Sequence, residues 1–122
     1  RPVLSAPNRM RRSSDFGAAV RRGRRAGSRT VVVHVLPSEA SSQAPVVVGF
    51  VVSKGVGGAV VRNRTKRRLR AVIRPLLPRL APGTRVVVRA QPAAALAATP
   101  ALDRDVTRAL ERAGALRAVE QP

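Results

Sequence analysis

The chain has 122 residues, a length that suits one domain with a modest apolar core. Its 24 lysines and arginines outnumber six acidic residues, and the formal net charge of +18 indicates a polyanionic partner, either nucleic acid or an anionic membrane surface. The lack of cysteine excludes disulfides, and no apolar run approaches the roughly 20 residues that cross a bilayer, so we expect a soluble intracellular protein.

The pattern of apolar residues, turn residues and helix caps predicts six elements in the order α-β-β-α-β-α, within a single domain that spans residues 1–122. The elements are predicted over residues 13–23, 29–36, 46–52, 59–76, 83–91 and 99–114. The two ends, residues 1–7 and 115–122, are predicted to be flexible.

The first helix is predicted to begin at Ser13 or Ser14 as its N-cap and to stop at Gly23. The two strands after it are β-branched and almost continuously apolar, which indicates that each is covered on both faces or is central in its sheet. We expect these strands to be antiparallel partners across the polar loop of residues 37–45. His34, the only histidine, lies on the first strand with no Ser or Cys partner nearby, which favours a packing role over a catalytic one.

Residues 53–60 form a glycine-rich loop that leads into the second helix. Such a loop can hold a phosphate at the N-terminus of a helix. It lacks the GxxxxGK[ST] pattern because Lys54 precedes the glycines, which argues against a nucleotide-hydrolysing loop. Contact with an RNA phosphate stays open.

The second helix is strongly basic and is predicted to end at Pro75 and Pro78. On a helical wheel, one arc is apolar and should pack on the sheet: Val61, Leu69, Val72, Ile73 and Leu76. The opposite face carries Asn63, Arg64, Lys66, Arg67, Arg68, Arg70 and Arg74, which either bind a polyanion or form a merely solvated face. Arg62 falls in the apolar arc, so its charge must reach the edge of the helix or enter a cleft between helix and sheet.

The last helix is predicted from Thr99 as its N-cap, Pro100 at the first helical position and Gly114 as its stop. The segment before it, residues 92–98, is an Ala/Pro-rich loop. The six acidic residues of the chain are scattered and are explained by caps and helix ends. No acid-base or metal-ligand constellation is evident, so the protein itself is predicted to do no bond-breaking chemistry.

The stretch of residues 48–74, VGFVVSKGVGGAVVRNRTKRRLRAVIR, closely resembles the signature region of the bacterial ribonuclease P protein family. That signature is a strand, Ser-Lys, a glycine-containing loop and an Arg-Asn-Arg helix followed by Lys-Arg. Residues 8–25, with an Asn-Arg and an Asp-Phe, resemble the opening of the family. The resemblance covers nearly the whole chain.

The resemblance implies an α+β fold similar to the second domain of the fifth small-subunit ribosomal protein, with a left-handed β-α-β crossover around the Arg-Asn-Arg helix. It also implies a protein that assists a catalytic RNA, which uses bound Mg²⁺ to free the mature 5′ end of transfer RNA from its precursor. The implied partners are the ribonuclease P RNA and the 5′ leader of the precursor, in the cytoplasm, with Mg²⁺ held mainly by the RNA. No membrane and no obligate protein partner are expected.

The resemblance also implies two sets of RNA-contacting residues. The first binds RNA and comprises Arg62, Asn63, Arg64, Lys66, Arg67, Arg68, Arg70, Lys54, Arg9, Arg11 and Arg12. The second lines a cleft between the sheet and the first helix that holds the leader, and comprises Phe16, Val20 and His34. Val20 and His34 stand where aromatic residues are common in the family, so base stacking worth about 1–3 kcal/mol per base is largely lost. Leader binding is therefore expected to depend on charge and shape.

Two outcomes are open for His34. If it lines the cleft with a pKa near its usual value of about 6.5, it gains charge in mild acid, and leader affinity strengthens between about pH 7.5 and 6. Burial without a partner would lower the pKa and remove this effect.

Two other classes of protein fit the charge of the chain. One is a nucleoid- or ribosome-associated protein that coats nucleic acid without catalysis. The other is a membrane-surface protein, although the basic helix lacks the Trp or Phe anchors that an interfacial helix favours.

Overall fold

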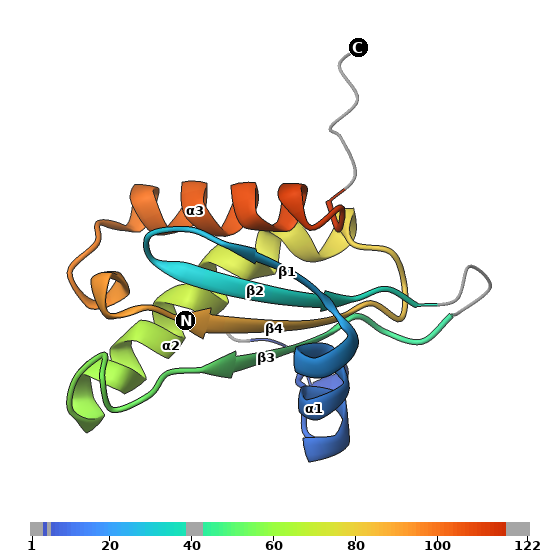
Figure 1. The fold of residues 1–122 in the computed structure, drawn as a ribbon, viewed down its shortest axis with the longest axis horizontal. Coiled ribbons are helices and arrows are strands. Elements are labelled where there is room, and N and C mark those ends of the chain that lie inside the picture. The colour runs from blue at the N-terminus through green and yellow to red at the C-terminus, as the bar shows by residue number, and fades with distance from the viewer. Residues whose placement is uncertain (1–3, 5, 39–42, 117–122) are drawn as a thin grey trace, which may run out of the picture.

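A four-stranded sheet with helices on both of its faces forms the centre of the fold (Figure 1). The computed structural model describes Leu4, residues 6–38 and residues 43–116. In chain order the elements are η1 (Ala6–Asn8), α1 (Ser13–Arg22), β1 (Arg24–Gly27), β2 (Val31–Leu36), β3 (Val47–Val51), α2 (Ala59–Ile73), η2 (Arg74–Arg79), β4 (Arg85–Ala90), η3 (Pro92–Ala95) and α3 (Thr99–Arg112). All six predicted elements are present, and β1 and three 3₁₀ helices are additional.

The order of the strands across the sheet is β1-β2-β4-β3. Strand β2 is antiparallel to both β1 and β4, while β3 is parallel to β4. The predicted antiparallel pairing of residues 29–36 with 46–52 is therefore wrong, because β4 lies between these two strands. An apolar β-branched pattern identifies a strand, but it does not say which strand lies beside it.

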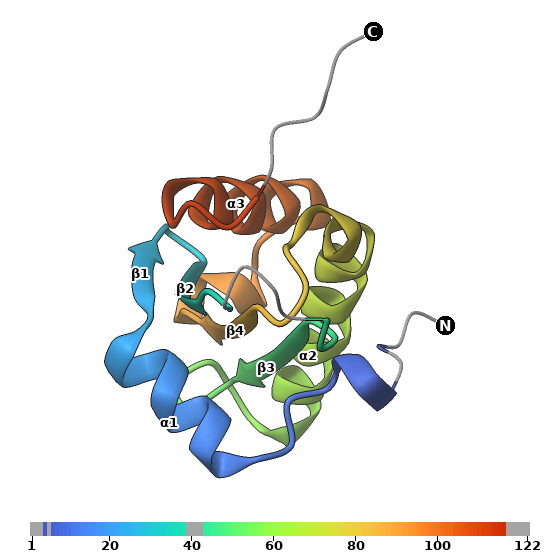
Figure 2. The ribbon, with the colours of Figure 1, turned by 90° about the vertical axis from the view of Figure 1, so that its right-hand side faces the viewer.

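The connection from β3 through α2 to β4 is a left-handed crossover. In Figure 1 both strands point to the left with β4 above β3, and Figure 2 places α2 on the side of the sheet that is away from the viewer of Figure 1. A helix on the far side makes this path left-handed, whereas about 98% of parallel crossovers are right-handed. The handedness implied by the resemblance is confirmed.

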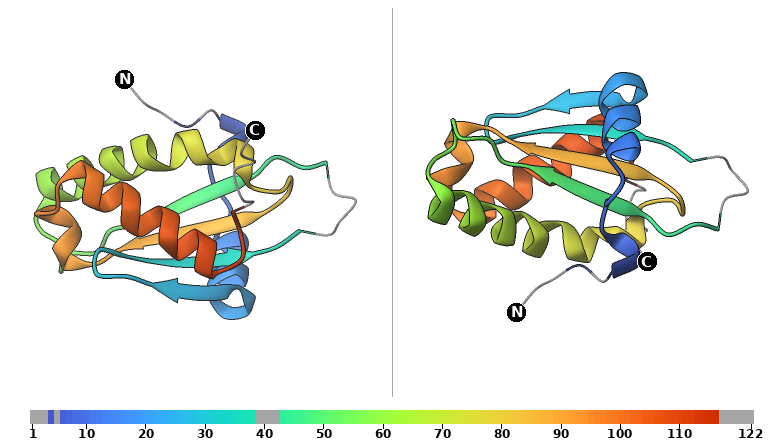
Figure 3. Two further views of the ribbon diagram at one scale, coloured as in Figure 1. Left: turned by 90° about the horizontal axis from the view of Figure 1, so that it is seen from above. Right: turned by 90° about the horizontal axis from the view of Figure 1, so that it is seen from below.

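Helices α2 and α3 lie side by side on one face of the sheet, and α1 crosses the other face (Figure 3). The larger core lies beneath α2 and α3 and includes Val31, Val33, Val35, Val86, Val88, Leu69, Ile73, Leu102, Val106 and Leu110. The smaller core lies beneath α1 and is formed by Met10, Ala19 and Val87, with Phe16, Leu36, Val47 and Val51 against it. Both faces of β2 are covered, as the continuous apolar run of residues 29–36 predicted. Strand β3, the other strand of that prediction, lies at the edge of the sheet and is only partly buried.

The N-terminal caps of α1 and α3 differ from the prediction. The cap positions are occupied by Arg12 and Ala98, without a side-chain hydrogen bond, so the predicted caps at Ser13 or Ser14 and at Thr99 are wrong by one or two residues. Cap preference in sequence gives the neighbourhood of a helix start and not its exact residue.

The ends of the last helix are closer to the prediction. Pro100 occupies the second helical position instead of the first. Gly114 ends the helix as predicted, with φ of +74°. The amides of Gly114 and Ala115 donate to the carbonyls of Glu111 and Leu110, which is the Schellman arrangement for a left-handed glycine.

Parts of both predicted flexible ends are packed. The side chain of Leu4 is only 2% exposed and belongs to the larger core, and Leu116 forms a β-bridge with Leu80. Residues 1–3, 5 and 117–122 lie outside the described residues. Within the described part of the chain, no helix is long and apolar enough to span a membrane.

Candidate nucleic-acid interface

Helix α2 buries one face and exposes a basic one, as the helical wheel predicted. Leu69, Val72 and Ile73 are buried, while Asn63, Arg64, Arg67 and Arg74 are exposed. Thr65 is also buried, and its hydroxyl donates to the carbonyl of Val61 at 2.8 Å, which satisfies a polar group inside the helix. With no acidic residue in its sequence, α2 presents positive charge along its exposed face.

Arg62 lies where the helix meets the core and is half-buried. Its Nε is buried and has no hydrogen-bond partner among the described residues. A buried donor without a partner costs about 1–3 kcal/mol, and more in a charged group. Arg62 is therefore a candidate for contact with an acceptor that the described chain does not supply.

A cavity of about 170 Å³ at the edge of β3 brings together predicted residues from three parts of the chain. Arg9 comes from the segment before α1, Phe16 from α1, and Lys66 and Arg70 from α2. The remaining wall is formed by Leu4, Met10, Val48, Gly49 and Phe50. Three cations and no acidic side chain line this cavity, so it favours an anionic group.

Phe50 is a cavity residue that sequence reasoning missed. The guanidinium carbon of Arg70 lies 5.9 Å from the centroid of the Phe50 ring, a cation–π distance. The available signal was its position: Phe50 is one of only two phenylalanines, and it lies inside the stretch that resembles the family signature.

Phe16 packs against the smaller core, on the same face of the sheet as Val87. A Cβ atom added at Gly49 would overlap the Phe16 ring and approach the Met10 sulfur to 3.0 Å, so the ring needs a glycine beneath it. Val20, one turn after Phe16 on α1, is 39% exposed. The first helix therefore packs Phe16 against the sheet and leaves Val20 exposed on the surface.

His34 faces the α1 side of the sheet, since its neighbour across the ladder is Val87 of the smaller core. Its side chain is only 6% exposed, and Nδ1 has no hydrogen-bond partner among the described residues. Burial lowers the pKa of His34 below 6.5, and the charges of Arg89 and Arg25 lower it further. Of the two outcomes left open by the sequence, the structure favours the second, so His34 is not expected to gain charge between pH 7.5 and 6.

Not all predicted RNA-binding cations are available to a ligand. Arg68 is half-buried and donates to the carbonyls of Ala94 and Ala97 and to the hydroxyl oxygen of Thr99. Arg67 is exposed and makes no hydrogen bond or ion pair within the described residues. The structure thus separates two neighbouring arginines that the resemblance had grouped together.

The remaining predicted RNA-binding residues lie on the surface. Lys54 is exposed in the turn after β3, and Arg11 and Arg12 are exposed just before α1. None of the three lines the cavity at β3. Their place in an RNA complex stays a prediction.

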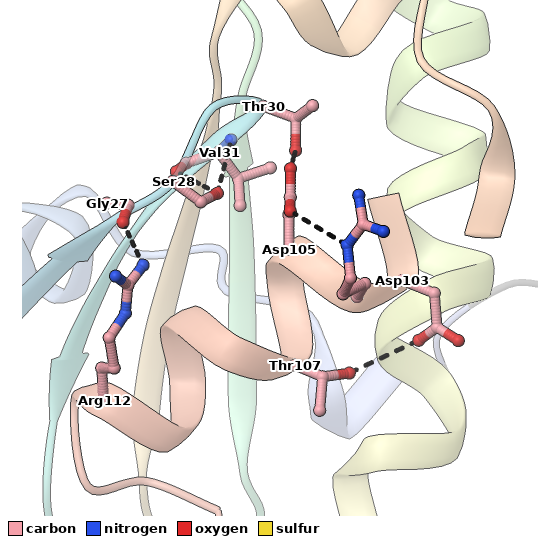
Figure 4. A network of polar contacts seen from close by, with 9 residues as sticks. Gly27, Ser28, Thr30, Val31, Asp103, Asp105, Thr107 and Arg112 are labelled. Atoms are coloured by element: carbon pink, nitrogen blue, oxygen red, sulfur yellow. Dashed lines mark hydrogen bonds and ion pairs between the residues drawn. The ribbon is translucent and has the colours of Figure 1, made fainter. Parts of the chain in front are cut away.

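Polar contacts fasten α3 to the turn between β1 and β2 (Figure 4). The Thr30 hydroxyl donates to Asp105 at 2.7 Å, and Arg112 donates to the carbonyl of Gly27. These contacts hold the β1–β2 hairpin against α3, and in the ladder of this hairpin Arg25 lies directly opposite His34. Strand β1 thereby adds a cation to the α1 face of the sheet.

An α+β domain with a cationic helix face, a cationic cavity and further arginines on its sheet defines a small basic nucleic-acid-binding protein. A family model described as Ribonuclease P matches residues 4–114, and the chain belongs to this ribonuclease P protein family. The ribonuclease P protein component of Beutenbergia cavernae is 54% identical over 120 residues, which cover 98% of each chain. That of Nocardioides sp. strain JS614 is 50% identical over 113 residues, covering 93% of this chain and 97% of the relative.

Solved structures confirm the fold. The ribonuclease P protein of Staphylococcus aureus has a TM-score of 0.78 at 23% identity, covering 90% of this chain and 98% of that one. The protein of Thermotoga maritima has a TM-score of 0.72 at 20% identity, covering 93% and 98%. A further S. aureus structure is of a mutant described as having defective mRNA degradation activity, with a TM-score of 0.79 at 24% identity, covering 89% and 90%.

Proposed function

We propose that this chain assists a catalytic RNA in removing the 5′ leader from precursor transfer RNA, in the cytoplasm. The observation that carries the proposal is the meeting of Arg9, Phe16, Lys66 and Arg70 at one cavity, in a chain that belongs to the ribonuclease P protein family. Phe16 and the pair Lys66 and Arg70 come from α1 and α2, the two helices to which the resemblance gives separate tasks, and Arg9 comes from the segment before α1. The cavity therefore lies between the proposed leader cleft and the proposed surface for the RNA subunit.

In this proposal the exposed face of α2 binds phosphates of the RNA subunit through Asn63, Arg64 and Arg67. The leader lies along the α1 face of the sheet, past Phe16 and Val20, with Arg25 and Arg89 as neighbouring cations. Because Phe16 is the one aromatic residue on this face of the described chain, charge and shape dominate the binding of the leader.

The hydrolytic step is assigned to the RNA. In residues 4, 6–38 and 43–116, no three His, Cys, Asp or Glu side chains come together in a way that would hold a metal ion. With no such group among the described side chains, we assign Mg²⁺ in the holoenzyme mainly to the RNA subunit. The contribution of the protein is binding and orientation.

The test is a pull-down of the tagged chain from cells of its own species, followed by sequencing of the bound RNA. The proposal expects one structured RNA, the ribonuclease P RNA, together with precursor transfer RNAs that retain their leaders. Enrichment of bulk ribosomal RNA or DNA would favour the nucleoid- or ribosome-associated protein instead. Enrichment of messenger RNA alone would favour an activity like the one named for the S. aureus mutant.

A further inference from the structure

Arg68 is bonded to the protein itself, although it lies on the most basic helix of the chain. Its Nη1 donates to the carbonyl of Ala94 at 3.4 Å, and its Nη2 donates to the carbonyl of Ala97 and, at 3.4 Å, to Oγ1 of Thr99. The three acceptors span the end of η3 and the first residue of α3. One guanidinium thus ties two consecutive elements to α2.

These contacts have a clear physical cause. The last carbonyls of a helix have no partner inside that helix, and arginine side chains commonly satisfy them. A half-buried guanidinium needs such acceptors, because an unpaired buried charge costs several kcal/mol. The planar fork of arginine reaches two carbonyls at once, which the single ammonium of lysine does not reproduce.

Arg64 lies one turn earlier on α2 and contacts the same segment. Its Nη2 donates to the carbonyl of Ala95 at 3.4 Å, while the residue as a whole stays exposed. Ala95 lies between Ala94 and Ala97, the two residues whose carbonyls Arg68 holds. Arg68 thus holds η3 in place through the carbonyl of Ala94. The position of η3 in turn fixes one end of the Arg64 guanidinium through the carbonyl of Ala95.

We propose that Arg68 is a positioning residue that holds η3 on α2 and thereby orients Arg64 toward the phosphates of the RNA, without contacting a phosphate itself. The inference rests on the proposed function, since it divides the cations of α2 into those that bind RNA and one that shapes the surface. Arg67 offers the matched comparison, because it is a neighbouring arginine that is exposed and makes no polar contact within the described residues.

The experiment is a double-mutant cycle on the affinity of the full chain for the ribonuclease P RNA of its own species, measured across a range of salt concentrations. The variants are Arg64→Ala, Arg68→Ala, Arg67→Ala and the two double variants that contain Arg64→Ala. Arg68→Ala should weaken binding by about threefold or more in the native background and have almost no effect once Arg64 is replaced. Arg67→Ala should weaken binding in both backgrounds and lower the salt slope in each by something under one unit.

A second variant and a structural readout separate positioning from charge. Arg68→Lys keeps the positive charge but loses the fork, so it should bind RNA as weakly as Arg68→Ala. In both Arg68 variants the amides of Leu96, Ala101 and Leu102 should exchange hydrogen faster, since their hydrogen bonds lie in the segment that Arg68 holds. Circular dichroism should show the fold retained.

Three outcomes would overturn the inference. They are full binding by Arg68→Lys, a further drop of the salt slope when Arg68→Ala is added to Arg64→Ala, and equal weakening by Arg68→Ala in both backgrounds. The first two would make Arg68 a phosphate contact, and the third would make its role a general one in stability. Failure of the proposed function looks different: native protein would then bind this RNA no better than an unrelated RNA, and Arg67→Ala would change nothing.

Discussion

At the scale of single residues, Gly49 decides how closely α1 can approach the sheet. A side chain at this position would overlap the ring of Phe16 and press on Met10, so the contact between helix and strand depends on a missing methyl group. The cavity at β3 also depends on this close contact, because Gly49, Phe16 and Met10 all line its wall. The sequence contains this information only as a glycine in an apolar strand, which marks a close approach but not the partner.

Gly49→Ala should lower the free energy of unfolding by about 1–3 kcal/mol, because the added methyl group overpacks the α1 face of the sheet. Denaturation with urea measures the change. Gly27→Ala is the matched control, since its Cβ would only reach ordinary contact at 3.7 Å from Val32, and its stability should be nearly unchanged. Equal losses in both variants would show that Phe16 moves aside without cost.

His34 carries a prediction about pH. Its pKa is lowered in the folded protein by burial and by Arg89 and Arg25, while in the unfolded chain it titrates near 6.5. Near and below that pH the unfolded state binds more protons than the folded state. The contribution of His34 to the free energy of unfolding is therefore fully present above pH 6.5 and is lost as the pH falls toward the lowered pKa.

The free energy of unfolding of the native protein should therefore decline as the pH is lowered from about 7.5 to 5, and His34→Phe should flatten this decline. Urea denaturation at a series of pH values measures both. Since the chain contains one histidine, no second imidazole complicates the comparison. An identical decline in the two proteins would place the responsible proton elsewhere.

At the scale of elements, periodicity predicted which face of α2 is buried, and the reason is that this face is set by the spacing of apolar residues alone. The partners of the strands depend on long-range contacts instead, so the antiparallel pairing of β2 with β3 was predicted wrongly. Strand β1, with the sequence Arg-Arg-Ala-Gly, shows no apolar alternation and is a strand only because its backbone pairs with β2.

In the candidate site, too, features set by local sequence could be predicted, and features set by long-range contacts could not. The Arg-Asn-Arg motif and the cations around it were visible in the sequence, because their residue types and spacing carry the signal. The contacts of Arg68 with η3 and the start of α3 were not visible, since they join residues 26 to 31 positions apart. Likewise, the burial of His34 follows from how α1 lies over the sheet and not from its own strand.

The basic face of α2 should bind RNA through local phosphate contacts and not through net charge. Arg67→Ala should therefore lower the magnitude of the slope of log K against log salt by something under one unit. Arg108→Ala, which removes one exposed cation from α3, is the control with the same change in net charge and should leave the slope nearly unchanged. Equal slopes for the two variants would assign Arg67 to a solvated face.

At the scale of the whole molecule, the charge of +18 is hardly compensated. Within the described residues, the structure contains two ion pairs, between Arg85 and Asp15 at 3.3 Å and between Arg104 and Asp105 at 3.9 Å. A large net charge of one sign destabilises the folded state through its own repulsion. Binding of a polyanion would therefore reduce this repulsion and stabilise the folded protein.

Raising the sodium chloride concentration from about 50 mM to about 500 mM should therefore raise the melting temperature of the free protein, because salt screens the repulsion. The same change should weaken its binding to RNA, because the release of counterions gains less free energy at higher salt. Thermal denaturation and binding assays across one salt series measure the two trends. A melting temperature that falls with salt would show that the surface charges are already compensated.

The most direct test is 5′ processing of a precursor transfer RNA by components purified separately. The ribonuclease P RNA of the same species, this protein and Mg²⁺ together should release the leader faster than the RNA and Mg²⁺ without protein. Rigorously RNA-free protein with Mg²⁺ should release none, because no group of metal-binding side chains comes together in the described residues. Leader release by the protein alone, or an equal rate with and without the protein, would contradict the role assigned to this chain.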